Sequence, residues 1–182
     1  MIVLVTGFGP YLRQRRNPTG ELAQAVDGRR MGTSHVVGRV LPTEFRACER
    51  SLRRAVRECR PDALVMFGLA PGRRRLAIEA VAMNVDHAED PDNAGKRAWR
   101  RPIKRGGPRL IDSTLPIDRL HEALKRARIP VAVSYHAGTY VCNHAFYVGA
   151  RMARRAGFVH VPKWGPGRLR RALEVIVRAL GR

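Results

Sequence analysis

The chain has 182 residues, 45% of them hydrophobic, and its 35 lysines and arginines against 15 aspartates and glutamates give a formal net charge of +20. This length predicts one α/β domain over residues 1–182, and no apolar run approaches the roughly 18–20 residues that cross a membrane. Three cysteines without a framework spacing argue against a secreted disulfide scaffold. We therefore expect a cytoplasmic protein without a signal peptide or a membrane partner.

The positive charge raises the alternative of a nucleic-acid-binding protein, because basic proteins attract polyanions at low salt. The basic clusters are spread along the whole chain and are rarely interleaved with aromatic residues. A dedicated nucleic-acid site would gather them on one face or one helix. We therefore favour a generally arginine-rich composition and expect no nucleic-acid partner.

Strand-like and helix-like patterns alternate along the first half of the chain. The dipeptide Asn17-Pro18 is typical of a helix start, and Thr43 is a candidate cap for the next helix. That second helix carries Cys48 and Cys59 on its apolar stripe, so we expect both thiols in the core. The elements predicted here are strands over 2–6, 36–41 and 63–67 and helices over 18–26 and 43–59.

The second half continues the alternation around a long polar connection over 86–108. We predict strands over 76–85, 131–134 and 158–162, and helices over 116–127, from Gly138 until Gly157, and over 169–180. Strands that alternate with helices indicate an α/β fold. The predicted architecture is a three-layer α/β/α sandwich with a largely parallel central sheet.

Cys142 lies where the predicted strand 131–134 passes through a turn at Gly138 into a helix. Backbone amides are unpaired in the first turn of a helix, and the helix dipole favours negative charge there. A thiol in that position is expected to ionise more easily and to become a better nucleophile. The alternative is a small buried residue, which is what most cysteines are.

A nucleophilic cysteine needs an imidazole and a group that orients it. His144 is a poor partner, because side chains two residues apart on a helix point about 200° apart, and nothing in the sequence fixes the direction of His136. His160, in the strand after the cysteine helix, is better placed. Glu79 lies in an apolar strand, where it either faces water on an edge or is held against a histidine. No HExxH or paired CxxC spacing predicts a metal site.

Several motifs resemble the pyroglutamyl-peptidase I (pyrrolidone-carboxylate peptidase) family of cysteine peptidases. They occur in the family's order and cover nearly the whole chain, and the block Ala-Gly-Thr-Tyr-Val-Cys-Asn-His is highly specific. The matching segments are Val5–Pro10 with Asn17-Pro18, Glu79–Asp86 with Pro91–Asn93, Ser113–Ile117, Ala137–His144 and Gly157–Pro162.

The resemblance implies a triad of Cys142 as nucleophile, His160 as general base and acid, and Glu79 as orienting carboxylate. It implies a thiol protease (a hydrolase and omega-peptidase) that removes an N-terminal pyroglutamyl residue from a peptide substrate through a thioester acyl-enzyme. No cofactor or metal is implied, and a homo-oligomer is. The residues that match the family's substrate pocket and its neighbouring loop are Phe8, Tyr11, Tyr140, Asp92 and Asn93.

Two positions beside the expected pocket depart from the family pattern: Leu69 replaces the usual glutamine, and Glu89 replaces the usual arginine. A carboxylate 5 Å from the thiolate would raise its energy by about 3 kcal/mol at an effective dielectric of 20. An altered substrate, or lost activity in a non-catalytic and polyanion-binding protein, is therefore the alternative. The complete triad argues against a binding protein, which needs none of the three groups.

Overall fold

A seven-stranded sheet forms the centre of the structure, a computed structural model that describes residues 1–11 and 14–181. Across the sheet the strands are β10 (Val131–Ser134), β5 (Leu76–Glu79), β11 (Arg155–Val161), β4 (Ala63–Leu69), β1 (Ile2–Phe8), β3 (Ser34–Leu41) and β2 (Arg30–Met31). β11, β4, β1 and β3 run parallel, whereas β5 is antiparallel to β11, and β2 is antiparallel to β3. The predicted largely parallel sheet is confirmed.

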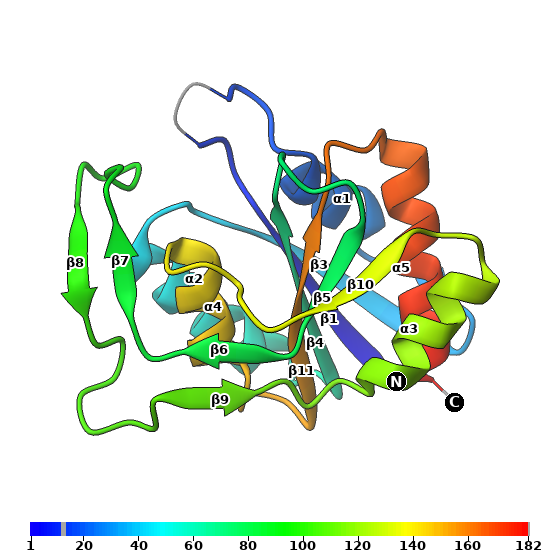
Figure 1. Cartoon of the computed structure of the whole chain (residues 1–182). Coiled ribbons are helices and arrows are strands. Elements are labelled where there is room, and N and C mark those ends of the chain that lie inside the picture. Colours follow the sequence, from blue (N-terminus) through cyan, green and yellow to red (C-terminus); the bar gives the residue numbers. More distant parts are fainter. Residues whose placement is uncertain (12–13, 182) are drawn as a thin grey trace.

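Helices cover both faces of this sheet, which confirms the three-layer sandwich (Figure 1). One layer holds α1 (Pro18–Val26), α3 (Ile117–Arg126) and α5 (Pro166–Leu180), and the other holds α2 (Phe45–Cys59) and α4 (Val141–Gly149). Successive side chains of β1 alternate between the two cores: Val3 and Val5 pack in the first, and Leu4 in the second. Burial on both faces explains why the parallel strands are continuous apolar runs.

The predicted strand over 76–85 is two strands that belong to different sheets. β5 ends at Glu79, and the chain leaves the central sheet at Ala80. Residues Val81–Met83 form β6, which pairs with β9 (Leu110–Asp112) in a separate two-stranded sheet. Glu79 therefore does not share a strand face with Val81 and Met83, and β5 is not an edge strand, because it lies between β10 and β11.

The polar connection over 86–108 contains a hairpin of β7 (Asp86–Ala88) and β8 (Ala98–Arg101), which stands apart from the central sheet (Figure 1). Its tip is tied to α2, because the Asp92 Oδ2 atom accepts a hydrogen bond of 3.1 Å from the backbone N–H of Phe45. The cap of α2 therefore comes from a distant segment, and not from Thr43 as predicted. This capping fixes the hairpin beside α2 and α4.

Gly157 does not end the cysteine helix as predicted. α4 ends at Gly149, and Gly157 lies inside β11. A Cβ atom at position 157 would come within 2.3 Å of the Ser113 Oγ atom, so this glycine permits close packing of the neighbouring segment.

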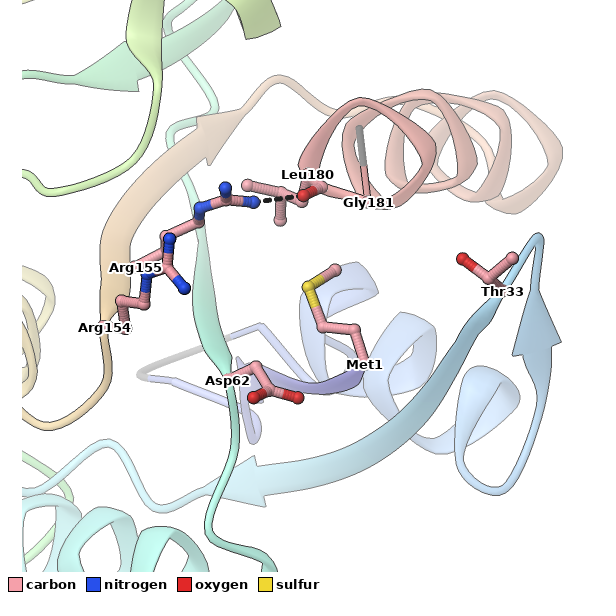
Figure 2. A pocket seen from close by; sticks show the side chains of 7 residues that line it. All are labelled: Met1, Thr33, Asp62, Arg154, Arg155, Leu180 and Gly181. Atoms are coloured by element: carbon pink, nitrogen blue, oxygen red, sulfur yellow. Dashed lines mark hydrogen bonds between the residues drawn. The ribbon is translucent and has the colours of Figure 1, made fainter.

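Two pockets lie at opposite edges of the parallel strands. One is at their amino edge, where β1, β4 and β11 begin, and is lined by Met1, Thr33, Asp62, Arg154, Arg155, Leu180 and Gly181 (Figure 2). The other is at their carboxyl edge, where β1 and β4 end, and Cys142 lines it. Sites in α/β folds gather at the carboxyl edge. Among the described residues, no helix is long and apolar enough to cross a membrane.

Candidate active site

The Glu79 carboxylate and the His160 imidazole form a buried hydrogen-bonded pair at the junction of β5 and β11. The Glu79 Oε1 atom lies 2.8 Å from His160 Nδ1, and the two residues are 0% and 6% exposed. The antiparallel register explains the contact: Glu79 is opposite Phe158, and His160 follows two residues later on the same strand face. Glu79 therefore faces the protein interior and contacts the imidazole.

Cys142 lies over the same face of the sheet as His160. A Cβ atom built on Gly68 would be 2.9 Å from the Cys142 sulfur, and Gly68 is the direct register partner of His160 in the parallel pair of β4 and β11. Side chains at paired positions of neighbouring strands point to the same face. The structure therefore brings Glu79, His160 and Cys142 together at one place, although they come from three separate elements.

A guanidinium completes the charge arrangement around Glu79. Arg73 Nη2 lies 3.1 Å from Glu79 Oε1 and 3.2 Å from the carbonyl oxygen of His136. Burial is the largest influence on the pKa of Glu79 and raises it, but the hydrogen bond from His160 and the charges of His160 and Arg73 lower it below its ordinary value overall. The carboxylate therefore stays ionised beside the imidazole.

The thiol of Cys142 is harder to ionise than its position in the chain predicts. Cys142 is the second residue of α4, in the first turn as expected. However, burial raises the pKa of the thiol to about 12, and the charge of Glu79 contributes in the same direction. Desolvation thus outweighs the helix amides, and the Cys142 thiol is protonated at rest.

The pocket beside Cys142 is small, with a volume of about 140 Å³ and a mostly apolar wall. Aromatic rings shape one side of it: Tyr11 and Tyr140 have ring centroids 5.1 Å apart, and Phe45 packs edge-on against Tyr140 at 5.3 Å. The lining residues are Phe8, Tyr11, Gln14, Asn17, Thr43, Leu69, Pro71, Tyr140 and Cys142. None of these side chains is acidic or basic, so the pocket suits a small neutral group.

The other predicted pocket residues, Glu89, Asp92 and Asn93, do not line the pocket. Glu89 is exposed in the bend after β7, and the carboxylate that raises the pKa of Cys142 is that of Glu79. Asp92 is buried and caps α2, and its Oδ1 atom also accepts hydrogen bonds from Ala94 and Lys96. Asn93 donates a side-chain hydrogen bond of 2.8 Å to the carbonyl oxygen of Pro10. These contacts hold the loops around the pocket.

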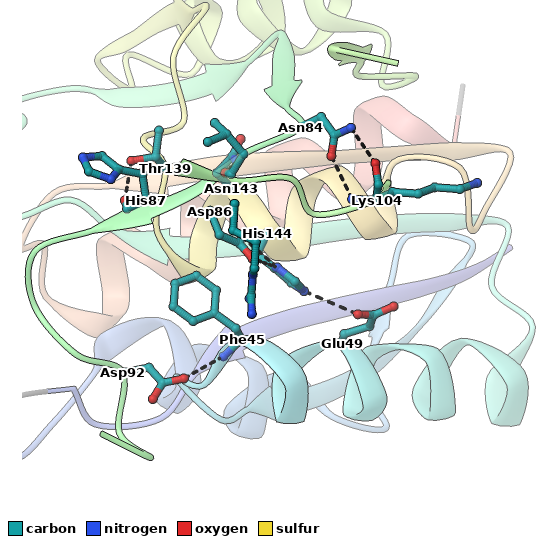
Figure 3. Close-up of polar contacts among 12 residues, drawn as sticks. Phe45, Glu49, Asn84, Asp86, His87, Asp92, Lys104, Thr139, Asn143 and His144 are labelled. Atoms are coloured by element: carbon teal, nitrogen blue, oxygen red, sulfur yellow. Dashed lines mark hydrogen bonds and ion pairs between the residues drawn. The ribbon is translucent and has the colours of Figure 1, made fainter. Parts of the chain in front are cut away.

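The two residues after Cys142 anchor α4, a role that the sequence did not indicate (Figure 3). The buried amide of Asn143 accepts from Met83 N–H and donates to the carbonyl oxygens of Met83 and Val85, each at 2.9 Å. His144 turns away from Cys142 toward α2, as its helical spacing predicted, and its Nδ1 atom lies 2.9 Å from Asp86 Oδ1. The cysteine helix is thus fixed on β6 and β7.

A metal centre is not formed by the residues that the structure describes. No group of three or more histidine, cysteine, aspartate or glutamate side chains among them could hold a metal ion. His136 instead accepts a hydrogen bond from Gly138 N–H through Nδ1 at 3.1 Å.

A nucleophile at a helix start, a histidine paired with a carboxylate, and an α/β sandwich together define the class of cysteine hydrolases. A sequence profile of the pyroglutamyl peptidase family matches residues 1–168. The chain belongs to this family.

Named relatives agree with this assignment. A pyrrolidone-carboxylate peptidase of Pyrococcus furiosus is 39% identical over 89% of this chain and 81% of its own length. Pyrrolidone-carboxylate peptidase 1 of Ralstonia nicotianae is 42% identical over 88% and 77%. A crystal structure of a mutant pyrrolidone carboxyl peptidase from P. furiosus superposes with a TM-score of 0.96 and 33% identity, covering 100% of this chain and 99% of that one.

Proposed function

We propose that this chain is a cysteine peptidase that hydrolyses the N-terminal pyroglutamyl residue from peptides. The observation that carries the proposal is the buried Glu79–His160 pair, with Cys142 over the same face of the sheet and beside a small neutral pocket. Membership of the pyroglutamyl peptidase family and the names of the relatives support the substrate.

The mechanism follows from the protonated state of the thiol. His160 takes the proton from Cys142 through Nε2 while the sulfur attacks the carbonyl carbon of the scissile peptide bond, which follows the lactam ring. Glu79 stabilises the resulting imidazolium through Nδ1–H. The tetrahedral intermediate then collapses to a thioester, and the imidazolium gives its proton to the departing amine of the peptide. Water attacks the thioester with His160 as base, which releases pyroglutamate and restores the thiol.

The oxyanion of the tetrahedral intermediate forms next to the start of α4. The first-turn amides of a helix have no intrahelical acceptor, and the positive end of the helix dipole lies there. The attack therefore develops negative charge where backbone donors are available. The helix start acts in this step, although it does not lower the pKa of the resting thiol.

The pocket wall supports a lactam as the group that is recognised. Enzymes that bind a free amino terminus need a counter-charge for its ammonium group, and none of the lining side chains that the structure describes is acidic. Phe8, Tyr11 and Tyr140 offer flat apolar surfaces to a flat ring. The reaction needs no cofactor, because thiol, base and water supply all the atoms that move.

Hydrolysis of pyroglutamyl-7-amido-4-methylcoumarin tests the proposal. The wild-type protein should release the fluorophore, and Cys142→Ser should abolish this, while Cys59→Ser, a change at the last residue of α2 that does not line the pocket, should keep the activity. Full turnover by Cys142→Ser would show that the nucleophile is another group. Failure of the wild-type protein to turn over this substrate, with prolyl or alanyl amides cleaved instead, would disprove the substrate assignment.

We also propose that the protein acts in the cytoplasm as a homo-oligomer. The cysteines pack singly and unpaired, which suits a reducing compartment. Trp99 and Tyr135 are 73% and 75% exposed, and large aromatic residues on a surface are typical of contacts between subunits. Light scattering after size-exclusion chromatography should give a mass of two or more times the 20.4 kDa of one chain. A monomer over a wide concentration range would contradict this part of the proposal.

A further inference from the structure

The pocket wall has few side chains that are free to hydrogen-bond a substrate. The Asn17 amide is partly committed: one N–H donates to the carbonyl oxygen of Gly9 at 3.1 Å, and its oxygen accepts from the backbone N–H and the hydroxyl of Thr19, so it keeps one free donor but no free acceptor. The Thr43 hydroxyl donates to the same Gly9 carbonyl at 3.3 Å. Leu69 has no polar side-chain atom. None of these three side chains can therefore both donate a hydrogen bond to a neutral polar ligand and accept one from it.

The two tyrosines of the pocket are committed as well. The Tyr140 hydroxyl donates to the carbonyl oxygen of Pro91 at 3.0 Å, and the hydroxyls of Tyr11 and Tyr140 interact with each other. Phe8 and Pro71 offer no hydrogen-bonding side chain. This leaves Gln14 as the amide of the described wall whose side chain can both donate to a ligand and accept from it.

Gln14 is held in place by its backbone. Gln14 N–H donates to the carbonyl oxygen of Tyr11 at 3.0 Å, and Tyr11 N–H donates back at 3.3 Å, as in a hydrogen-bonded pair of antiparallel strands. The side chains of such a pair lie on the same face, and both line the pocket. Among the residues that the structure describes, the carboxamide of Gln14 has no hydrogen-bond partner.

A primary carboxamide matches a lactam at two atoms. In a five-membered lactam the ring forces the amide to be cis, so its N–H and its C=O point to the same side. The carboxamide of glutamine also presents one N–H and one C=O along a single edge. The two edges can pair through two antiparallel hydrogen bonds, with the glutamine N–H donating to the lactam oxygen and the lactam N–H donating to the glutamine oxygen.

We propose that Gln14 is the specificity residue of this enzyme and pairs in this way with the lactam edge of the pyroglutamyl ring. The inference rests on the proposed function and deepens it, because it names the side chain that distinguishes pyroglutamate from a ring of the same size without an amide. A site that hydrogen-bonds its substrate rejects analogues that lack the matching groups more strongly than a purely apolar pocket does.

The main test replaces the carboxamide by an apolar group of similar size. Gln14→Leu should lower kcat/KM for pyroglutamyl-7-amido-4-methylcoumarin by about 10–100-fold, as expected for the loss of two neutral hydrogen bonds. Gln24→Leu is the matched control, because Gln24 is exposed on α1 and does not line the pocket. Thermal unfolding of both variants shows whether either has lost its fold.

Two further readouts separate pairing with the lactam from a general effect on the pocket. The inhibition constant of pyroglutamamide should rise by a similar factor in Gln14→Leu, while that of cyclopentanecarboxamide, which lacks the ring amide, should change less than about threefold. Gln14→Glu should be poor at neutral pH, because a carboxylate cannot donate to the lactam oxygen, and its rate relative to wild type should rise at lower pH as the acid protonates.

The role of Gln14 and the proposed function can be refuted separately. Wild-type turnover together with unchanged kcat/KM in Gln14→Leu would overturn the role of Gln14 and leave the proposed function intact. Equal losses for both inhibitors would also overturn it, because they would indicate a change of pocket shape. An inactive wild-type protein would overturn the proposed function, and this inference with it.

Discussion

Gly68 is the position at which a single methyl group should disable this enzyme. It lies near the end of β4, beside His160, and its missing side chain leaves space for two neighbours. A Cβ atom there would be 2.7 Å from Phe158 Cζ and 2.9 Å from Cys142 Sγ. Both distances are too short for any real contact, so Gly68→Ala has to displace the ring, the sulfur or both.

The size of the displacement follows from ordinary contact distances. Non-bonded heavy atoms rest at about 3.5–4.0 Å, so the sulfur has to retreat by roughly 0.6–1.1 Å if the backbone of β4 stays in place. A misplacement of about 1 Å in an active site typically costs on the order of 10²-fold in rate. Overpacking of a dense core costs about 1–3 kcal/mol of folding free energy, which a protein of this size tolerates.

The assay compares Gly68→Ala with Gly72→Ala, because no heavy atom lies within 4 Å of a Cβ built at position 72. Hydrolysis of the pyroglutamyl coumarylamide should fall about 100-fold in the first variant and stay near wild type in the second. Urea unfolding should show that Gly68→Ala is still folded. Wild-type kcat in a folded Gly68→Ala protein would refute the placement of the sulfur against β4.

Three further changes test the surroundings of the site. Because the pKa of Glu79 is lower in the folded protein than its ordinary value of 4.5, its charge stabilises the fold above that pH, and this contribution is lost as the pH falls through the lowered value. The stability gap between wild type and Glu79→Gln in urea should therefore narrow from pH 7 toward pH 3, and a constant gap would contradict the sign of the shift. Asn143→Ala removes three buried hydrogen bonds and should cost about 2–4 kcal/mol in the same assay, whereas a loss under 1 kcal/mol would mean that water replaces the amide. Asp92→Ala removes the cap of α2 and should lower stability by about 1–2 kcal/mol, with kcat/KM nearly unchanged; a large rise in KM at unchanged stability would instead indicate substrate contact.

The raised pKa of Cys142 changes how the enzyme works at rest. A thiolate–imidazolium pair would be reactive toward any electrophile, whereas in the proposed mechanism a protonated thiol becomes nucleophilic only when His160 accepts its proton. The local pattern, a thiol in the first turn of a helix, predicts the opposite direction. The local pattern reflects only the helix amides, which lower the pKa of the thiol. The desolvation that raises this pKa comes from residues packed around the helix.

Strand and helix periodicity predicted most of the elements, since this signal depends only on neighbours along the chain. The strand over 131–134 matches β10, and Asn17 caps α1 by accepting from Thr19 N–H at 3.1 Å. Some predictions that depended on distant residues were wrong. The predicted strand over 76–85 breaks at Ala80, because its second part pairs with β9, and no local pattern announces that partner.

The sequence by itself determined the layered α/β architecture, the family, and the three residue types that a thiol hydrolase needs, because these depend on periodicity and on motifs of neighbouring residues. Only the tertiary structure decided that Glu79 faces inward, since that depends on β5 lying between β10 and β11. It also decided that the Cys142 thiol is protonated at rest, and that the Gln14 carboxamide lines the pocket without a hydrogen-bond partner among the described residues. Burial and hydrogen-bond commitments are set by residues that are distant in the chain, so they become visible only when the fold brings those residues together.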